Sequence, residues 1–242
     1  MNKTKEYDLT VIVPAYNEEE NVERLEKTLG DFLPTSKLKT CVLFVDDGSK
    51  DRTLPLVKEV CQRNKDFFYL ALKQNGGLSA AMKAGIDATF SPYVGYIDAD
   101  LQTTPEDFNL LIPHLADNEL VMGIRASRKD SLFKKLQSKI ANGFRRFMTK
   151  DGVADTGCPL KIIHTDYAKR IPFFTGMHRF LPALIQLQHG RVYQVPVRHF
   201  PREAGVSKYH LFNRLVQPFG DCFAFRWMKA RYINYTPGDN NL

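Results

Sequence analysis

Short apolar runs and amphipathic stretches alternate along residues 9–115, and this alternation constrains the fold more than any other feature of the chain. Each run has the length of a buried strand, and the stretch after it repeats apolar residues at helical spacing. Strands that alternate with helices form right-handed β–α–β units, so we expect a mostly parallel sheet covered on both faces. The predicted strands are Leu9–Val13, Cys41–Val45, Phe67–Leu72 and Tyr93–Ile97.

Local signals predict where three of the helices begin. Asn17 starts a capping-box-like pattern, and Thr104 followed by Pro105 is the preferred order of a cap and a first-turn proline. A third helix follows Asn75–Gly77 and carries small residues along 80–88, which let a helix pack closely against a sheet.

The length of 242 residues and a hydrophobic content of 43% suit one α/β domain with an appendage. No apolar run approaches the roughly 20 residues that span a bilayer, which argues against an integral membrane protein. Residues 1–8 are polar and lead directly into the first predicted strand, so we expect no signal peptide and a cytoplasmic protein. The four cysteines show no CxxC spacing, and we expect reduced thiols in or near the core.

The charge of the chain is distributed unevenly. Residues 1–122 hold 13 Lys and Arg against 20 Asp and Glu, whereas residues 123–242 hold 21 against 7. The basic half is therefore expected to face an anionic partner such as phosphates, a membrane surface or nucleic acid. An ordinary solvated basic face explains the composition equally well.

The basic half differs in pattern from the first half. It predicts a basic amphipathic helix over residues 131–148, a helix near Phe180–Gln188, a strand over Val192–Val197, and a helix over His210–Tyr232 that Pro218 kinks. The last helix alternates aromatic residues with Lys and Arg, which suits an anionic bilayer interface, but an apolar stripe at this period equally suits a core or dimer contact. We expect a disordered tail from residue 236.

Polar loops follow three of the predicted strands, and parallel strands bring such loops to one edge of the sheet. Asp98 and Asp100 stand one residue apart after an apolar strand, and Gln102 adds a neutral oxygen. Hard oxygen ligands of this kind hold a divalent cation that also binds a diphosphate. Two carboxylates that cap a turn are the structural alternative.

Asp46 and Asp47 end another strand, where a carboxylate accepts hydrogen bonds from a ribose or from a base N–H. Asp-Asp-Gly-Ser is also good turn and helix-cap chemistry, and both roles are compatible.

Together these segments resemble the family 2 glycosyltransferases, and most closely the branch of dolichol-phosphate mannose synthases and bacterial polyprenyl-phosphate glycosyltransferases. The resemblance covers about residues 8–210 and implies a GT-A fold, with a mostly parallel Rossmann-like sheet flanked by helices and a C-terminal helical extension. The motifs that carry it are Val11–Glu19, Val45–Ser49, Asn75–Ala81, Asp98–Gln102 with Pro105-Glu106, and Arg202–Lys208.

The resemblance implies roles for individual residues. We expect the divalent ion, Mg²⁺ or Mn²⁺, at Asp98, Asp100 and Gln102. Catalytic roles fall to Asp100, Arg202 and Asp155. Arg125, Lys134 and Ser138 are expected to bind the acceptor phosphate. The donor-binding residues are Pro14, Ala15, Tyr16, Glu18, Asp46, Asp47, Asp98 and Lys208.

The implied reaction moves a sugar, with inversion, from a UDP- or GDP-sugar to a polyprenyl phosphate. An ionised phosphate attacks without a general base, whereas a sugar-hydroxyl acceptor on a glycan or glycoprotein, the alternative, requires one. Asp155 is then the best candidate base and His178 a weaker one, for which packing or hydrogen bonding is the more ordinary role.

Other function classes fit less well. A dinucleotide-dependent oxidoreductase is disfavoured because Pro14–Glu18 replaces the GxGxxG turn after the first strand. Nucleic-acid binding is disfavoured because the sequence shows no nucleic-acid-binding motif and the acidic half repels phosphates.

We expect a peripheral protein at the inner face of the membrane, with a membrane partner subunit or a homo-oligomer as further options. The predicted division is a glycosyltransferase domain over residues 1–208, with a nucleotide-sugar half (1–122) and an acceptor half (123–208). An amphipathic helix over 209–235 and a tail over 236–242 follow.

Overall fold

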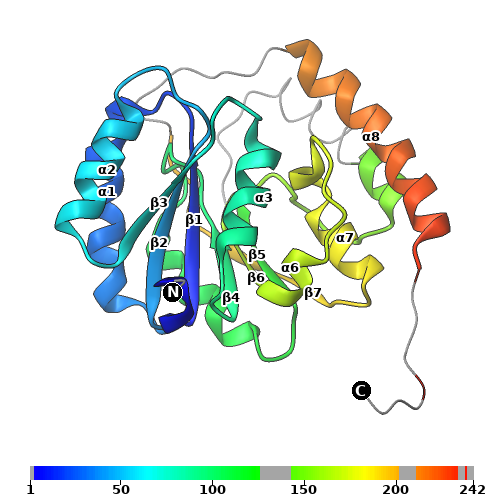
Figure 1. Ribbon diagram of the computed structural model, residues 1–242. Coiled ribbons are helices and arrows are strands. Elements are labelled where there is room, and N and C mark those ends of the chain that lie inside the picture. The colour runs from blue at the N-terminus through cyan, green and yellow to red at the C-terminus, as the bar shows by residue number, and fades with distance from the viewer. Residues whose placement is uncertain (1–2, 126–142, 202–210, 234–237, 239–242) are drawn as a thin grey trace.

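The computed structural model describes residues 3–125, 143–201, 211–233 and 238, and the side chains of these residues except 211–218. A seven-stranded sheet with the order β3-β2-β1-β4-β6-β5-β7 forms its centre (Figure 1). The strands are β1 (Leu9–Ala15), β2 (Thr40–Asp46), β3 (Phe67–Ala71), β4 (Tyr93–Tyr96), β5 (Leu120–Arg125), β6 (Lys161–His164) and β7 (Val192–Val197).

The sheet is parallel except at β6, which runs antiparallel to both β4 and β5. The predicted α/β class with a mostly parallel sheet is therefore confirmed. The four strands predicted in the first half are all present, within two residues of their predicted ends. Their runs are apolar because both faces of the sheet are covered, and every residue of β2 is buried.

Helices cover both faces of the sheet and divide the core in two. Against one face pack α1 (Val22–Phe32), α2 (Thr53–Arg63) and α4 (Phe108–Leu111), while α3 (Leu78–Ala88), α6 (Thr165–Lys169), α7 (Leu181–Leu187) and α8 (Leu211–Arg231) contribute to the core on the other (Figure 1). Short 3₁₀ turns connect them at Lys3–Glu6, Glu19–Asn21, Leu33–Thr35, Pro105–Asp107, Ile112–His114 and Met177–Arg179.

The small residues of α3 allow the close packing that the sequence predicts. A Cβ added at Gly85 would lie 2.8 Å from the Cδ1 atom of Ile12 on β1. The helix therefore approaches the sheet more closely at this point than a larger residue would permit.

One predicted helix start differs from the structure, and a second is in place without its side-chain cap bond. Asn17 does not cap the following helix. It lies in a left-handed turn (φ 50°), and its side-chain oxygen accepts the Lys50 N–H at 2.8 Å, so a contact distant in sequence replaces the local one. Thr104 makes no side-chain cap bond, although Pro105 does open a 3₁₀ turn as expected. Pro113 lies in a second 3₁₀ turn, and only Phe108–Leu111 between the two turns is α-helical.

The C-terminal helix α8 has one buried and one exposed face. Cys222 and Phe225 are buried, and the Phe225 ring stacks on Phe180 with 6.0 Å between centroids. Phe223 and Trp227 on the other face are 59% and 62% exposed. One face therefore belongs to the core, as the structural alternative proposed, and Phe223 and Trp227 on the other face are largely exposed in the part of the chain that the structure describes.

All four cysteines are free thiols, as predicted, and three are fully buried. No helix within the described residues is both long and apolar enough to cross a bilayer. The predicted tail from residue 236 and most of the predicted helix over 131–148 lie outside the described residues, and residues 143–149 are helical.

Candidate active site

A cavity of about 620 Å³ opens at the carboxyl ends of β1, β2 and β4. This volume suits a nucleotide-sized ligand. Eight of the residues predicted from the sequence line the cavity together: Pro14, Ala15, Tyr16, Glu18, Asp47, Asp98, Asp100 and Gln102. The prediction that these loops converge at one sheet edge is thus confirmed, while the role of each residue stays a prediction.

Asp47 organises one end of the cavity. Its Oδ1 accepts the Gly76 N–H at 2.8 Å, and its Oδ2 accepts the Gly77 N–H and the Asn75 amide, each at 2.8 Å. Burial raises the pKa of Asp47, and the two backbone donors oppose that rise. The carboxylate therefore holds the Asn75–Gly77 loop beside the place where a ligand would lie.

Asp46 has a different position from its neighbour. It is 1% exposed, and its Oδ2 accepts the Ser49 N–H at 3.2 Å. It is not among the described residues that line the cavity. Its geometry fits the turn-forming role that the sequence left open for it.

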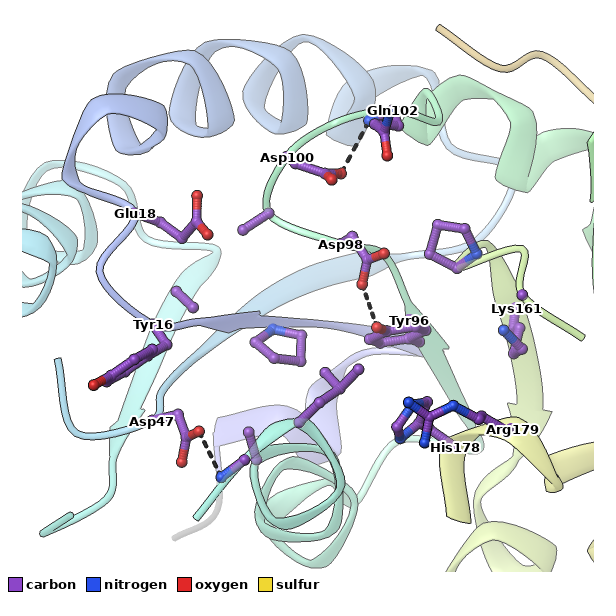
Figure 2. A pocket seen from close by; sticks show the side chains of 18 of the residues that line it. Tyr16, Glu18, Asp47, Tyr96, Asp98, Asp100, Gln102, Lys161, His178 and Arg179 are labelled. Carbon is purple, nitrogen blue, oxygen red and sulfur yellow. Dashed lines mark hydrogen bonds between the residues drawn. The ribbon is translucent and has the colours of Figure 1, made fainter. Parts of the chain in front are cut away.

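The Asp98–Gln102 segment forms the middle of the cavity (Figure 2). The Tyr96 hydroxyl donates to Asp98, and the Gln102 N–H donates to Oδ1 of Asp100 at 3.2 Å. Between Asp100 and Gln102, Leu101 adopts a left-handed backbone conformation (φ 48°). This conformation is unusual for a bulky side chain and occurs often at functional turns.

The side chains at this turn present only oxygen atoms to a cation, from two carboxylates and one amide. This donor set fits Mg²⁺ or Mn²⁺ when a ligand's phosphate oxygens complete the shell. Within the described ranges, no three His, Cys, Asp or Glu side chains form a metal-binding group by themselves.

Three nitrogen-bearing side chains, Lys161, His178 and Arg179, line the other end of the cavity (Figure 2). Sequence reasoning missed Lys161 and Arg179 as site residues. A lysine opening the apolar strand of residues 161–164 is a signal that could have found the first. Arg179 is adjacent in the chain to His178, which the sequence indicates as a weaker candidate base.

His178 is held in place by α3. Its Nδ1 lies 3.0 Å from the Ser79 Oγ, which also accepts the Gly176 N–H at 3.0 Å. Burial, with the positive charges of Arg179 and Lys161, lowers the pKa of His178 to about 3. The imidazole is therefore neutral at physiological pH.

Arg125 and Asp155 bind each other. The Arg125 Nε and Nη2 donate to the two Asp155 carboxylate oxygens at 2.8 Å each, and Asp155 Oδ1 also accepts the Gly157 N–H at 3.0 Å. Burial would raise the pKa of Asp155, but the hydrogen bonds and charge of Arg125 hold it below its usual value. Thr156 and Gly157 line the cavity, whereas neither Arg125 nor Asp155 is among its described lining residues.

The remaining predicted site residues, Arg202, Lys208, Lys134 and Ser138, lie outside the described residues.

Comparison with known proteins explains this arrangement. The family model described as Glycosyl transferase family 2 matches residues 10–171. This range includes Asp98, Asp100 and Gln102 and most of the sheet. The chain belongs to glycosyl transferase family 2. The predicted enzyme class, a glycosyltransferase, is thereby confirmed.

Two curated relatives are similar over most of this family 2 chain. The dodecaprenyl-phosphate galacturonate synthase of Rhizobium johnstonii is 34% identical over 93% of this chain and 69% of its own length. The undecaprenyl-phosphate 4-deoxy-4-formamido-L-arabinose transferase of Pectobacterium carotovorum is 35% identical over 84% of this chain. The match spans 62% of that second relative's length.

Solved structures show the same fold at low sequence identity. The glucosyl-3-phosphoglycerate synthase of Mycobacterium tuberculosis, in complex with Mn²⁺, UDP and glucosyl-3-phosphoglycerate, has a TM-score of 0.68 and 14% identity over 96% of this chain and 84% of its own. The mannosyltransferase PcManGT of Pyrobaculum calidifontis, with GDP-Man and Mn²⁺, has a TM-score of 0.65 and 19% identity over 96% of this chain and 66% of its own.

Proposed function

We propose that this glycosyltransferase moves a sugar from a nucleotide-sugar donor to a polyprenyl phosphate, assisted by Mg²⁺ or Mn²⁺. The observation that carries the proposal is the oxygen-only set of Asp98, Asp100 and Gln102 inside a nucleotide-sized cavity of a family 2 chain. The named activities of the two curated relatives, both on polyprenyl phosphates, support the acceptor.

The donor lies along the acidic part of the cavity. Tyr16 and the loop held by Asp47 receive the nucleoside, with Pro14, Ala15 and Glu18 beside it. Asp98, Asp100 and Gln102 would hold the divalent ion, which would supply positive charge to the diphosphate of the donor. Tyr96, which donates to Asp98, orients that carboxylate.

The transfer replaces one C–O bond by another. An ionised oxygen of the acceptor phosphate forms a bond to the anomeric carbon, and the bond from that carbon to the donor diphosphate breaks with its electron pair. The nucleoside diphosphate leaves, and no proton needs to be removed from the acceptor. Attack opposite the leaving group inverts the anomeric configuration.

The state of the two candidate bases favours a phosphate acceptor over a sugar hydroxyl. A general base works best with a pKa near the operating pH. His178 has a pKa of about 3, and the paired Asp155 has a pKa below its usual value, so both accept a proton poorly at neutral pH. A hydroxyl acceptor would lack an effective base among these two residues.

An exposed aromatic surface supports action at a membrane. We define it by Phe147, Phe219, Phe223 and Trp227, which are 50–70% exposed. Exposed basic side chains, including Arg226, accompany it on α8 and at the end of the 143–149 helix. Aromatic rings among basic residues suit the interface of an anionic bilayer, which is where a polyprenyl phosphate resides. On this basis we propose peripheral attachment to the inner face of the membrane, and a membrane partner subunit or a homo-oligomer stays a prediction.

A transfer assay tests the proposal. The full chain is incubated with Mg²⁺ or Mn²⁺ and a panel of UDP- and GDP-sugars, with and without undecaprenyl phosphate, and product is followed into organic solvent. We expect turnover of one donor only when the lipid is present, and a loss of at least 100-fold in Asp100→Ala. Transfer to a soluble glycan instead, or full activity in Asp100→Ala, would contradict it.

A further inference from the structure

The charged residues of the cavity differ in sign between its two ends, and Asp98 lies near the boundary because Tyr96, its hydrogen-bond donor, has its ring beside Lys161. Its acidic side chains, Glu18, Asp47, Asp98 and Asp100, belong to the part where we place the nucleoside and the metal-bound diphosphate. At the other end lie Lys161, on β6, and Arg179, in the Met177–Arg179 turn, with His178 beside Arg179 in that turn (Figure 2). A donor laid along the acidic part therefore brings its sugar to the cationic end.

Lys161 is a buried lysine that faces this end, and burial lowers the pKa of its ammonium. It is 3% exposed and opens β6, where it pairs with Tyr96 of β4. Its ammonium donates to the Cys158 carbonyl and lies 5.5 Å from the centroid of the Tyr96 ring. An ammonium has three donors, and within the described ranges the Cys158 carbonyl is its one hydrogen-bond acceptor. A ligand oxygen would satisfy a second donor.

Arg179 supplies a second positive charge from a different element. The Met177–Arg179 turn follows Gly176, whose left-handed conformation (φ 92°) aims the turn toward the cavity. The neutral His178 beside it has Nδ1 directed at Ser79, so Nε2 is the ring nitrogen that remains for a ligand. Two cations and one neutral hydrogen-bonding group from two segments thus converge on one place.

The residue predicted to bind the acceptor phosphate, Arg125, already makes a two-point ion pair with Asp155. A guanidinium in such a pair is less available for a second oxyanion. Arg179 has a looser carboxylate neighbour, Asp221: a Cβ added at Gly176 would lie 2.6 Å from Asp221 Oδ2 and 3.4 Å from Arg179 Nη1. Burial raises the pKa of Asp221, and the charge of Arg179 opposes that rise.

We propose that Lys161 and Arg179, with neutral His178, form an oxyanion subsite for a second anionic group, distinct from the donor diphosphate. This inference rests on the proposed function. A phosphate of the acceptor and a carboxylate of an acidic donor sugar share the required chemistry: each presents oxygen atoms to an ammonium and a guanidinium at the sugar end of the cavity.

Binding to the full chain tests the subsite without requiring transfer. Calorimetry first identifies which of UDP and GDP binds with Mg²⁺, and then inorganic phosphate is titrated into that complex. The variants are Arg179→Gln, at a half-buried position, and Lys161→Met, which keeps the length of the side chain. Lys58→Met and Arg170→Gln remove one cation each away from the cavity and serve as controls.

We expect both site variants to bind the nucleoside diphosphate within about threefold of the original chain and to bind phosphate at least tenfold more weakly. Both controls should match the original chain. Weaker binding of the nucleoside diphosphate itself by the same factor would assign these residues to the diphosphate and overturn the subsite. Unchanged phosphate binding in Arg179→Gln would overturn it as well.

A second pair of measurements distinguishes the two sources of the oxyanion. If the acceptor supplies it, Arg179→Gln raises the KM for a short polyprenyl phosphate at least tenfold with every donor. If the sugar supplies it, the variant instead loses the preference for a UDP-uronate over the corresponding neutral UDP-hexose. Phosphate binding that depends on Arg179 in a chain without lipid transfer would refute the proposed acceptor and leave the subsite standing.

Discussion

Gly48 lies where the 46–49 loop packs tightly against the 74–77 loop. It has a left-handed conformation (φ 68°), and an added Cβ would lie 2.5 Å from the Gln74 carbonyl carbon and 2.6 Å from the Asn75 nitrogen. These are backbone atoms that cannot rotate away. We expect Gly48→Ala to lower the free energy of unfolding by about 3 kcal/mol, from backbone strain and overpacking together, as measured by urea denaturation.

Gly30 is the matched control for this substitution. It lies inside α1, and nothing comes within 4 Å of an added Cβ. Gly30→Ala should therefore stabilise the protein by about 1 kcal/mol, the difference in helix propensity. A Gly48→Ala protein as stable as the original would show that the 46–49 and 74–77 loops separate easily, against the structure.

His178 gives the protein a specific pH dependence. Its pKa falls from 6.5 to about 3 on folding, chiefly through burial. Below pH 6.5 the unfolded chain therefore binds a proton that the folded chain excludes, so the free energy of unfolding decreases as the pH falls from 6.5 toward 3. His178→Asn keeps a polar group near Ser79. It should reduce the slope of unfolding free energy against pH by the equivalent of up to about one bound proton, as measured by urea denaturation from pH 4 to 8.

His189 provides the comparison. It is exposed, with a left-handed backbone (φ 61°) that asparagine tolerates, so His189→Asn should leave the slope unchanged. Equal slopes in the original protein and in His178→Asn would mean that the imidazole stays accessible to protons when folded.

At the scale of elements, a buried ion pair fixes the loop that carries Thr156 and Gly157 to the cavity. Arg145, in the 143–149 helix, donates to the Asp151 carboxylate and to the Val153 carbonyl, the latter at 2.9 Å. Asp151→Ala leaves the Arg145 charge buried without its partner, so we expect a loss of about 3–5 kcal/mol in unfolding free energy. Chemical denaturation measures it.

The double variant Arg145→Met with Asp151→Leu separates the charge from the packing. It removes both charges, and we expect it to recover much of the stability lost in Asp151→Ala. If the double variant is as unstable as the single one, shape rather than charge holds this loop.

The strands and the converging loops could be predicted because their signals are local. An apolar run followed by Asp98-Ala99-Asp100 contains both the strand and the position of its carboxylates. The pairing of β6 between β4 and β5 could not be predicted, since it depends on contacts distant in sequence. Lys161 was missed for this reason: only that pairing carries its ammonium under Tyr96. The ion pair of Arg125 with Asp155, 30 residues apart, was equally invisible.

At the scale of the whole molecule, the two halves of the chain supply opposite charges to one cavity. The acidic half contributes Glu18, Asp47, Asp98 and Asp100 to the cavity, and the basic half contributes Lys161 and Arg179. The same basic half carries α8, whose buried face packs on Phe180, next to Arg179. The surface proposed to meet the membrane and the cationic end of the cavity are thus joined by direct packing.

The exposed aromatic surface makes the last prediction. Phe223 and Trp227 lie one helical turn apart on α8, and both are more than half exposed. Together they offer a large apolar area to a bilayer, and the neighbouring basic residues add attraction to anionic lipids. We expect the protein to sediment with vesicles containing phosphatidylglycerol, less with neutral vesicles and less at high salt, because salt screens the charges.

Removing the rings should abolish this binding without disturbing the core, since α8 keeps Cys222 and Phe225 on its buried face. The double variant Phe223→Ser with Trp227→Ser should bind anionic vesicles at least tenfold more weakly. Tyr69→Ser with Phe90→Ser removes two rings that are 45% and 52% exposed elsewhere, and it should bind like the original protein. If both double variants lose vesicle binding equally, the binding depends only on general surface hydrophobicity. If Phe223→Ser with Trp227→Ser binds vesicles like the original protein, α8 does not make the membrane contact.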